Sequence, residues 1–184
     1  MLLFIRHGRS EDFEFMFQQE VGVMTTILEE ARFKVVISTD SGEPVEYYSF
    51  SSREYKLFKP DKKLADIEVG DYVGVIMPCM AKGSDGHADP EEISLVKDAV
   101  AHGKPIAAQR GAIIILGEAG ALEGKKYAFK NPYPRFKGAL YSGTGVIRDG
   151  KIITSAICPN AARYYGDPDG TPELVELFVE AIKE

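Results

Sequence analysis

The sequence predicts an α/β fold: a three-layer sandwich in which helices cover both faces of a mostly parallel sheet. Two observations support this prediction. Strand-like apolar runs alternate with helix-like segments along the chain, which is the pattern of parallel α/β proteins. Several of these runs are apolar without strict alternation, as expected for strands that are buried on both faces. The length of 184 residues and the hydrophobic content of 45% are consistent with one domain over residues 1–184.

Strands and helices are expected in alternating order along the chain. The predicted strands cover residues 2–6, 34–39, 72–77, 105–108, 139–141, 146–148 and 151–155. The predicted helices cover residues 13–31, 90–102, 111–119, part of 160–165, and 172–183. Pro90, Glu91 and Glu92 match the preferences of a helix N-terminus, and Gly103 matches a C-terminal stop.

Residues 43–63 are polar, aromatic and irregular, and they interrupt this alternation. We expect a hairpin or a similar excursion from the sheet. Two groups of aromatic residues are better explained by core packing or a homodimer contact than by base stacking, because the chain lacks a basic groove. The two groups are Tyr47, Tyr48, Phe50, Tyr55 and Phe58, and Tyr133, Phe136, Tyr141, Tyr164 and Tyr165.

The most informative segment is the run GKPIAAQRG at residues 103–111, which is followed by an apolar helix. It predicts a buried strand, a sharp turn and a helix start. In α/β enzymes such a turn lifts one side chain, often a nucleophile, above the sheet, and nearby backbone N–H groups stabilise an oxyanion. We place Gln109 at the tip of the turn. An amide is not a nucleophile, so the turn has the shape of a catalytic elbow without its reactive atom.

Three further segments surround this turn in a fixed order. They are DYVGVIMPCM at residues 71–80, GEAGALEGKK at 117–126 and DGKIITS at 149–155. Together with the turn they resemble the ThiJ/PfpI family of the class I glutamine amidotransferase-like superfamily, whose motifs read DYDALVLPGG, GKPVAAICHG, AGLLxGR and DGxxITS. The resemblance covers nearly the whole chain. It implies a flavodoxin-like sheet and a homodimer.

The resemblance also implies a site in which several positions have changed. The family's nucleophilic Cys falls on Gln109, the following residue, often His, falls on Arg110, and a Gly pair falls on Cys79 and Met80. Glu20 matches the acidic residue that usually holds the Cys proton. Family activities are of the hydrolase, protease and deglycase type. The changes therefore imply a divergent member without this Cys-dependent chemistry.

The carboxyl ends of the predicted parallel strands should meet at one edge of the sheet, where open α/β sheets bind their ligands. This edge collects Arg6, Met80 and the turn at Gln109. The N–H groups of Met80 and Arg110, beside the helix that starts at Gly111, are candidate anion donors. We therefore predict a pocket for a carboxylate, a carbonyl compound or a small anion.

Two cysteines and a loop histidine are the candidates for a reactive group. Cys79 lies at the rim of the predicted pocket, where Arg110 and a helix N-terminus favour a thiolate; the alternative is a small buried apolar residue. Cys158 ends an Ala-Ile-Cys sequence like that of the family nucleophile, which we interpret as a coincidence. His87 is either a general base that reaches the pocket or a solvated loop residue.

The run Arg6-His7-Gly8 resembles the Arg-His-Gly motif of the histidine phosphatase family, in which His is phosphorylated and Arg holds phosphate. That chemistry also requires a second Arg, a later His-Gly and an acid. The later His102-Gly103 ends a predicted helix before a strand that fits the other family. A histidine-phosphatase-like enzyme is therefore a minor alternative.

Composition excludes several classes of protein. The net charge of −6 and the pI of about 5.2 argue against sequence-independent nucleic-acid binding, which relies on clustered Lys and Arg. No apolar run approaches the roughly 20 residues of a membrane span, and residues 1–5 are too short for a signal h-region. Two cysteines form no disulfide framework. We expect a cytoplasmic protein with no cofactor and no metal.

Two functions are consistent with these observations. In the first, the chain is a non-catalytic relative that binds a small anionic or carbonyl metabolite, or acts in a stress response. In the second, it is an intracellular hydrolase, protease or glyoxalase-like enzyme with Cys79 as a relocated nucleophile. Glu20 or His87 is then the acid/base, and the N–H groups of Met80 and Arg110 are the oxyanion donors.

Overall fold

The computed structural model describes residues 1–6, 13–81 and 86–184. The strands of its main sheet are β1 (Leu2–Ile5), β2 (Val36–Thr39), β5 (Lys62–Lys63), β6 (Val75–Met77), β7 (Ile106–Gln109), β10 (Val146–Asp149) and β11 (Ile152–Ser155). Their order in the sheet is β10-β11-β7-β6-β1-β2-β5. Neighbouring strands are parallel, except that β10 pairs antiparallel with β11 at one edge. The predicted mostly parallel α/β sheet is confirmed.

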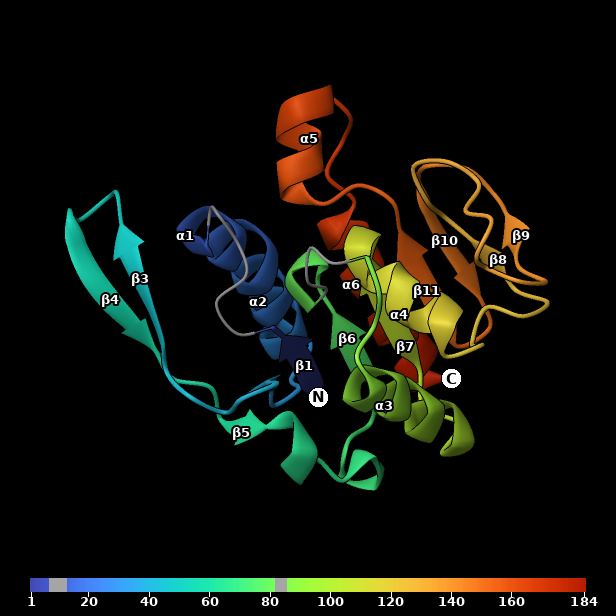
Figure 1. The fold of residues 1–184 in the computed structure, drawn as a ribbon, viewed down its shortest axis with the longest axis horizontal. Coiled ribbons are helices and arrows are strands. Elements are labelled where there is room, and N and C mark those ends of the chain that lie inside the picture. Colours follow the sequence, from blue (N-terminus) through green and yellow to red (C-terminus); the bar gives the residue numbers. More distant parts are fainter. Residues whose placement is uncertain (7–12, 82–85) are drawn as a thin grey trace.

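Helices cover both faces of this sheet (Figure 1). The α-helices of the described residues are α1 (Phe13–Met16), α2 (Val23–Glu30), α3 (Pro90–Ala101), α4 (Ile113–Glu118), α5 (Pro159–Tyr165) and α6 (Thr171–Lys183). Leu3 and Ile5 of β1 belong to the core under α2 and α6, whereas Leu2 and Phe4 belong to the core under α3 and α4. Because side chains alternate along a strand, β1 contributes to both cores, and all four residues are fully buried.

The helix predicted over residues 13–31 forms as three consecutive segments. A π-helical turn, η1 (Phe17–Gly22), joins α1 to α2. Such turns hold one more residue per turn than an α-helix and occur frequently at functional sites. Glu20 lies within η1 and is fully buried. The π-helical turn therefore places a carboxyl group inside the protein.

The segment at residues 43–63 forms the predicted hairpin, from β3 (Val45–Ser49) and β4 (Glu54–Phe58), and continues into β5. Figure 1 shows the hairpin projecting beside α1, away from the main sheet. The strand predicted at 139–141 forms as β9 (Leu140–Tyr141). It pairs with β8 (Lys126–Tyr127) in a separate two-stranded sheet, so it is not part of the main sheet. No helix in the described ranges is long and apolar enough to cross a membrane.

Candidate active site

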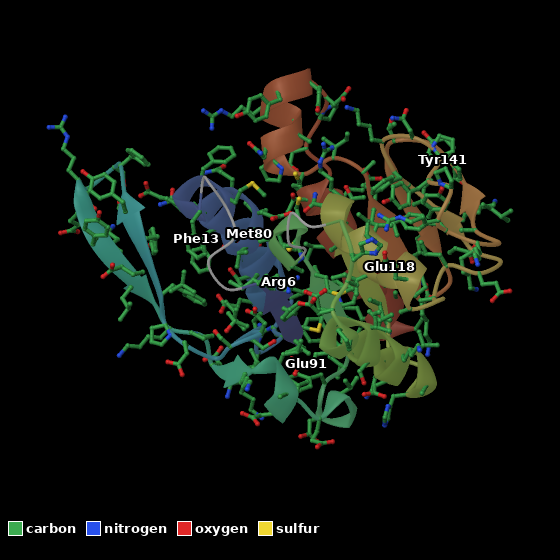
Figure 2. All side chains as sticks on the ribbon, viewed as in Figure 1. Arg6, Phe13, Met80, Glu91, Glu118 and Tyr141 are labelled. Atoms are coloured by element: carbon green, nitrogen blue, oxygen red, sulfur yellow. The ribbon has the colours of Figure 1, made fainter. Side chains whose placement is uncertain are left out.

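Four connecting segments meet at the carboxyl end of the parallel strands. Arg6 follows β1, and its N–H donates a hydrogen bond to the carbonyl of Met80 at 3.0 Å. Met80 lies in a 3-10 turn, η4 (Cys79–Ala81), which follows β6. Figure 2 shows Arg6 and Met80 close together near the middle of the molecule. Arg110 follows β7 and Cys158 follows β11, so the site has one contribution from each of four strand ends.

The turn between β7 and α4 is displaced by one residue from the prediction. Gln109 is the last residue of β7 and is fully buried. Its Nε2 donates to the Ile157 carbonyl at 2.8 Å and to the Thr171 hydroxyl at 2.9 Å. The residue with left-handed backbone geometry is Arg110, whose φ is +44°. The placement of Gln109 at the tip is therefore wrong: the tip is Arg110, and Gln109 anchors the segment that carries Cys158.

Two thiols lie against each other at this edge. Cys79 begins η4, and Cys158 directly precedes α5. The Cys79 thiol donates a hydrogen bond to the Cys158 sulfur, and this contact together with burial raises the pKa of Cys79 well above its ordinary 9.0. The same hydrogen bond lowers the pKa of Cys158 to about 7, against the opposing effect of burial. Backbone N–H groups of Ala161 and Asn160 add to this lowering, as does the charge of Arg110.

Glu20 lies beside the two thiols. Its Oε1 accepts the N–H of Cys79 at 2.7 Å, and its carboxyl group also accepts the N–H of Met80. Burial, and then the negative charge of Cys158, raise the pKa of Glu20 well above its ordinary 4.5. Burial therefore favours the neutral, protonated form of this side chain. Because Oε2 has no hydrogen-bond partner among the described residues, we assign the proton to Oε2.

The guanidinium of Arg110 extends the site toward α5. It lies 5.7 Å from the centre of the Tyr165 ring, and Lys130 Nζ lies 4.3 Å from the same centre. The hydrogen bond from Lys130, and the charges of Lys130 and Arg110, lower the pKa of Tyr165. The Nη1 atom of Arg110 is buried without a hydrogen-bond partner in the described part of the chain. An anion beside Cys158 would supply the missing acceptor.

Residues 10–166 match the sequence model of the DJ-1/PfpI family. This chain belongs to the DJ-1/PfpI family. It is 27% identical over 113 residues to an uncharacterized protein of Archaeoglobus fulgidus, a match that covers 59% of this chain and 67% of that protein. It is 32% identical over 114 residues to the uncharacterized protein MJ0967 of Methanocaldococcus jannaschii, covering 58% of this chain. The chain spans about half the length of that second relative, 54%.

The fold of this DJ-1/PfpI chain is similar to a solved structure of the same family. The crystal structure of a ThiJ/PfpI domain protein from Brachyspira murdochii superposes with a TM-score of 0.71. The two chains are 15% identical, and the similarity covers 99% of this chain and 95% of the other. At this identity the comparison shows the shared fold alone. The resemblance to the ThiJ/PfpI family is thus confirmed, while the roles of individual residues remain predictions.

Two of the groups predicted to bind a ligand are engaged within the protein. The Met80 N–H donates to Glu20, so it is not free to act as an oxyanion donor. Arg6 is buried and forms ion pairs with Asp89 and, at 3.2 Å, with Glu92. These pairs connect the end of β1 to the capping box at the start of α3. The Gly111 N–H contacts the Cys79 sulfur. Among the predicted ligand-binding residues Arg6, Met80 and Gly111, Gly111 is therefore the one that contacts a thiol directly.

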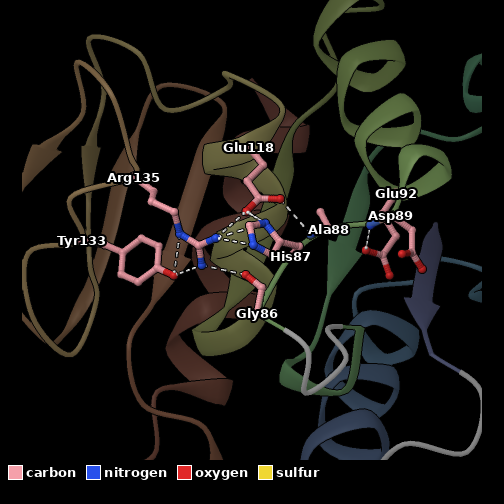
Figure 3. A network of polar contacts seen from close by, with 8 residues as sticks. All are labelled: Gly86, His87, Ala88, Asp89, Glu92, Glu118, Tyr133 and Arg135. Atoms are coloured by element: carbon pink, nitrogen blue, oxygen red, sulfur yellow. Dashed lines mark hydrogen bonds and ion pairs between the residues drawn. The ribbon is translucent and has the colours of Figure 1, made fainter.

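His87 lies in a surface network that is distinct from the thiol pair (Figure 3). Its Nδ1 is 3.2 Å from Glu118 Oε1, and the Arg135 guanidinium contacts both the ring and Glu118. Glu118 is the last residue of α4, at the opposite end of that helix from the Arg110 turn. The His87 side chain is 72% exposed. The geometry thus gives no support for His87 as a base at the thiol pair.

The structure brings Cys158 to the same edge of the sheet as Cys79 and Arg110, a placement that the sequence interpretation did not use. The signal was the Ala-Ile-Cys sequence, which was interpreted as a coincidence. His7 and Gly8, on which the histidine-phosphatase alternative depends, lie outside the described residues. Within the described ranges no group of three or more His, Cys, Asp or Glu side chains has an arrangement that could hold a metal ion.

Proposed function

We propose that this DJ-1/PfpI protein is a thiol-dependent enzyme that acts on a small carbonyl or acyl compound, with Cys158 as its nucleophile. The observation that carries the proposal is the environment of Cys158: it accepts a hydrogen bond from Cys79, adjoins the start of α5 and lies near the charge of Arg110. With a pKa of about 7, a large fraction of this thiol is ionised at neutral pH. The hypothesis that Cys79 is the nucleophile is replaced, because the raised pKa of Cys79 keeps that thiol protonated.

The neighbouring groups have complementary roles in this proposal. The Cys158 thiolate adds to the carbonyl carbon, a C–S bond forms, and the π electron pair of the carbonyl moves to its oxygen. That oxygen takes the proton of Glu20 Oε2, which leaves Glu20 as a carboxylate. The Cys79 thiol holds Cys158 by its hydrogen bond. The unpaired Nη1 of Arg110 binds a negative group of the substrate.

One observation favours a second function, namely binding of a small anionic metabolite without turnover. Cys158 is 1% exposed, so a substrate reaches its sulfur only if the surrounding side chains move. A protein that responds to stress by ligand binding needs no such movement. In this case Arg110 and Lys130 would hold the anion, and neither thiol would react.

The test is the pH dependence of iodoacetamide alkylation of the native protein, measured separately at each cysteine by peptide mass spectrometry. The proposal predicts modification of Cys158 with an apparent pKa near 7 and slow modification of Cys79, which serves as the internal comparison.

Consumption of methylglyoxal and of a chromogenic ester is then measured for the wild type and Cys158→Ser. Loss of activity in the variant supports the enzyme. Activity that survives in Cys158→Ser would sink the assignment of the nucleophile. Protection of Cys158, no turnover and equal anion binding by both proteins would favour the second function.

A further inference from the structure

Two positive side chains from distant segments meet at the ring of Tyr165. The guanidinium carbon of Arg110 lies 5.7 Å from the centre of this ring, and Lys130 Nζ lies 4.3 Å from the same centre. Lys130 Nζ also donates a hydrogen bond to the Tyr165 hydroxyl at 3.3 Å. Figure 1 shows α5, which ends at Tyr165, beside the loop between β8 and β9 that carries Lys130. The three side chains form one group, which we call the cation cluster.

The positive charge of the cation cluster is not neutralised by carboxylates of the described residues. Three of the described arginines are at least partly buried, and two of them, Arg6 and Arg148, form ion pairs with carboxylates. The third is Arg110, and neither it nor Lys130 forms such a pair within the described ranges. The chain has 28 acidic and 22 basic residues, so this lack of partners is not explained by composition. Two unpaired cations at one ring favour an anionic ligand.

The donors of the cluster suit a phosphate group. Arg110 Nη1 is buried and has no hydrogen-bond partner in the described part of the chain. The Tyr165 hydroxyl accepts the bond from Lys130, so its own proton remains available. Donors from three side chains match the three free oxygens of a phosphate monoester better than the two of a carboxylate, and two cations match a dianion. The hydrogen bond from Lys130 and the charges of both cations lower the pKa of Tyr165, as expected at a positive potential.

The cation cluster adjoins the segment that carries Cys158. Strands β7 and β11 are parallel neighbours in the sheet, and Gln109 Nε2 at the end of β7 donates to the Ile157 carbonyl at 2.8 Å. Arg110 and Cys158 are the next residues along these two segments. Helix α5 begins directly after Cys158 and rises by about 1.5 Å per residue, so Tyr165 lies roughly 10 Å along it. One small molecule can therefore contact both the cluster and the segment of Cys158.

We propose that the cation cluster binds the phosphate group of a phosphorylated carbonyl compound, whose carbonyl group faces Cys158. The phosphate end of this inference depends on the cluster alone. The carbonyl end rests on the proposed function, which supplies the thiol. Arg110, Lys130 and Tyr165 are then the residues that select the phosphorylated substrate over its unphosphorylated counterpart.

Binding is tested with inorganic phosphate alone, by calorimetric titration of the native protein at constant ionic strength. We expect saturable binding of phosphate and about tenfold weaker binding of acetate, which has one charge and two oxygens. Lys130→Gln and Tyr165→Phe should each weaken phosphate binding about fivefold. The matched controls are Lys137→Gln, at an exposed lysine of the same loop, and Tyr164→Phe, at the neighbouring tyrosine of α5. Both controls should bind phosphate like the wild type.

Three results of this titration would overturn the inference: no binding of phosphate, equal binding of acetate, or control variants that lose as much affinity as the cluster variants. Cys158→Ser should bind phosphate like the wild type, because the thiol is outside the phosphate site. The phosphate site is thereby tested whether or not Cys158 is a nucleophile.

Turnover distinguishes a phosphorylated substrate from free phosphate. We expect kcat/KM for glyceraldehyde 3-phosphate to exceed that for glyceraldehyde, and Lys130→Gln to reduce the ratio of the two values. If phosphate binds as expected but neither compound is consumed, the phosphate site stands and the thiol enzyme fails. If Cys158-dependent consumption of both compounds is equal and Lys130→Gln leaves the ratio unchanged, the enzyme stands and the phosphorylated substrate is disproved.

Discussion

At the scale of the residue, Arg110 has both an unfavourable left-handed backbone conformation and a positive charge that acts on Cys158. A side chain in the left-handed region costs roughly 1–2 kcal/mol, a cost that glycine avoids. Arg110 nevertheless occupies this region at the tip of the turn, with φ +44°. Its charge contributes to the low pKa of Cys158, and its Nη1 is buried. We infer that an arginine stands at this strained position because its guanidinium has a role in the site, and not because its conformation is stable.

Replacing this residue separates the two effects. Arg110→Gly should relieve the backbone by about 1 kcal/mol while raising the apparent pKa of Cys158 toward its ordinary value. Arg32→Gly is the matched control, because Arg32 is exposed at the end of α2 and has a φ of +66°. It should stabilise the protein similarly and leave Cys158 unchanged. Chemical denaturation measures stability, and iodoacetamide kinetics measure the pKa. An unchanged Cys158 in Arg110→Gly would contradict the electrostatic role of Arg110.

The turn was predicted correctly from the sequence, but its tip was placed one residue too early, at Gln109 in place of Arg110. Counted from Gly103 without a gap, the run GKPIAAQR places Arg110, and not Gln109, at the Cys of the family motif GKPVAAIC, and the backbone angle of Arg110 agrees with this alignment. Glu20 and Cys79 were identified correctly as neighbours of the turn by their places in the motifs. The contact between Cys158 and Cys79 was not predicted, because it joins the ends of two strands that are not adjacent and such a contact leaves no local pattern in the sequence.

At the scale of the element, the π-helical turn η1 determines where Glu20 lies. A continuous α-helix was predicted from the apolar pattern of residues 13–31. A single inserted residue changes that pattern too little to be recognised in one sequence. The two-residue strands β5 and β8 were missed for a similar reason, because so short a segment has no periodicity. The long elements, by contrast, have enough periodic positions, and α3 and α6 form within a few residues of their predicted ends.

The burial of Glu20 in η1 predicts a pH dependence of stability. A carboxyl group whose pKa is raised on folding contributes stability that is fully present below its unfolded pKa and is lost as pH rises toward the folded value. Glu20→Gln keeps the shape and removes this titration. The variant should therefore gain stability relative to the wild type between pH 5 and pH 6.5, a window below the pKa of about 7 of Cys158. Denaturant midpoints at these two pH values measure the change. Parallel profiles would mean that folding does not raise the pKa of Glu20.

At the scale of the whole molecule, the alternation of strands and helices was sufficient to predict the sheet and its two covering layers. It could not predict how the hairpin sits, which depends on contacts between distant segments. One face of the hairpin packs on α1 and η1, where Tyr47 lies 5.0 Å from Phe13 and Phe58 lies 4.6 Å from Phe17, between ring centres. The opposite face carries Tyr48 paired with Tyr55.

This second face is the basis for predicting a homodimer. Tyr55 is 71% exposed and Leu57 is 55% exposed, and both lie on a hairpin that projects from the body of the protein. Burial of such an apolar face against a second copy would remove it from water. We expect the wild type to sediment as a dimer and the double variant Tyr55→Ser, Leu57→Ser to shift toward monomer. The matched control is Tyr164→Ser, since Tyr164 on α5 is 73% exposed but lies outside the hairpin; it should remain dimeric. Sedimentation velocity over a range of concentrations distinguishes these cases. A monomeric wild type would refute the dimer, and a double variant that associates like the wild type would place the contact elsewhere.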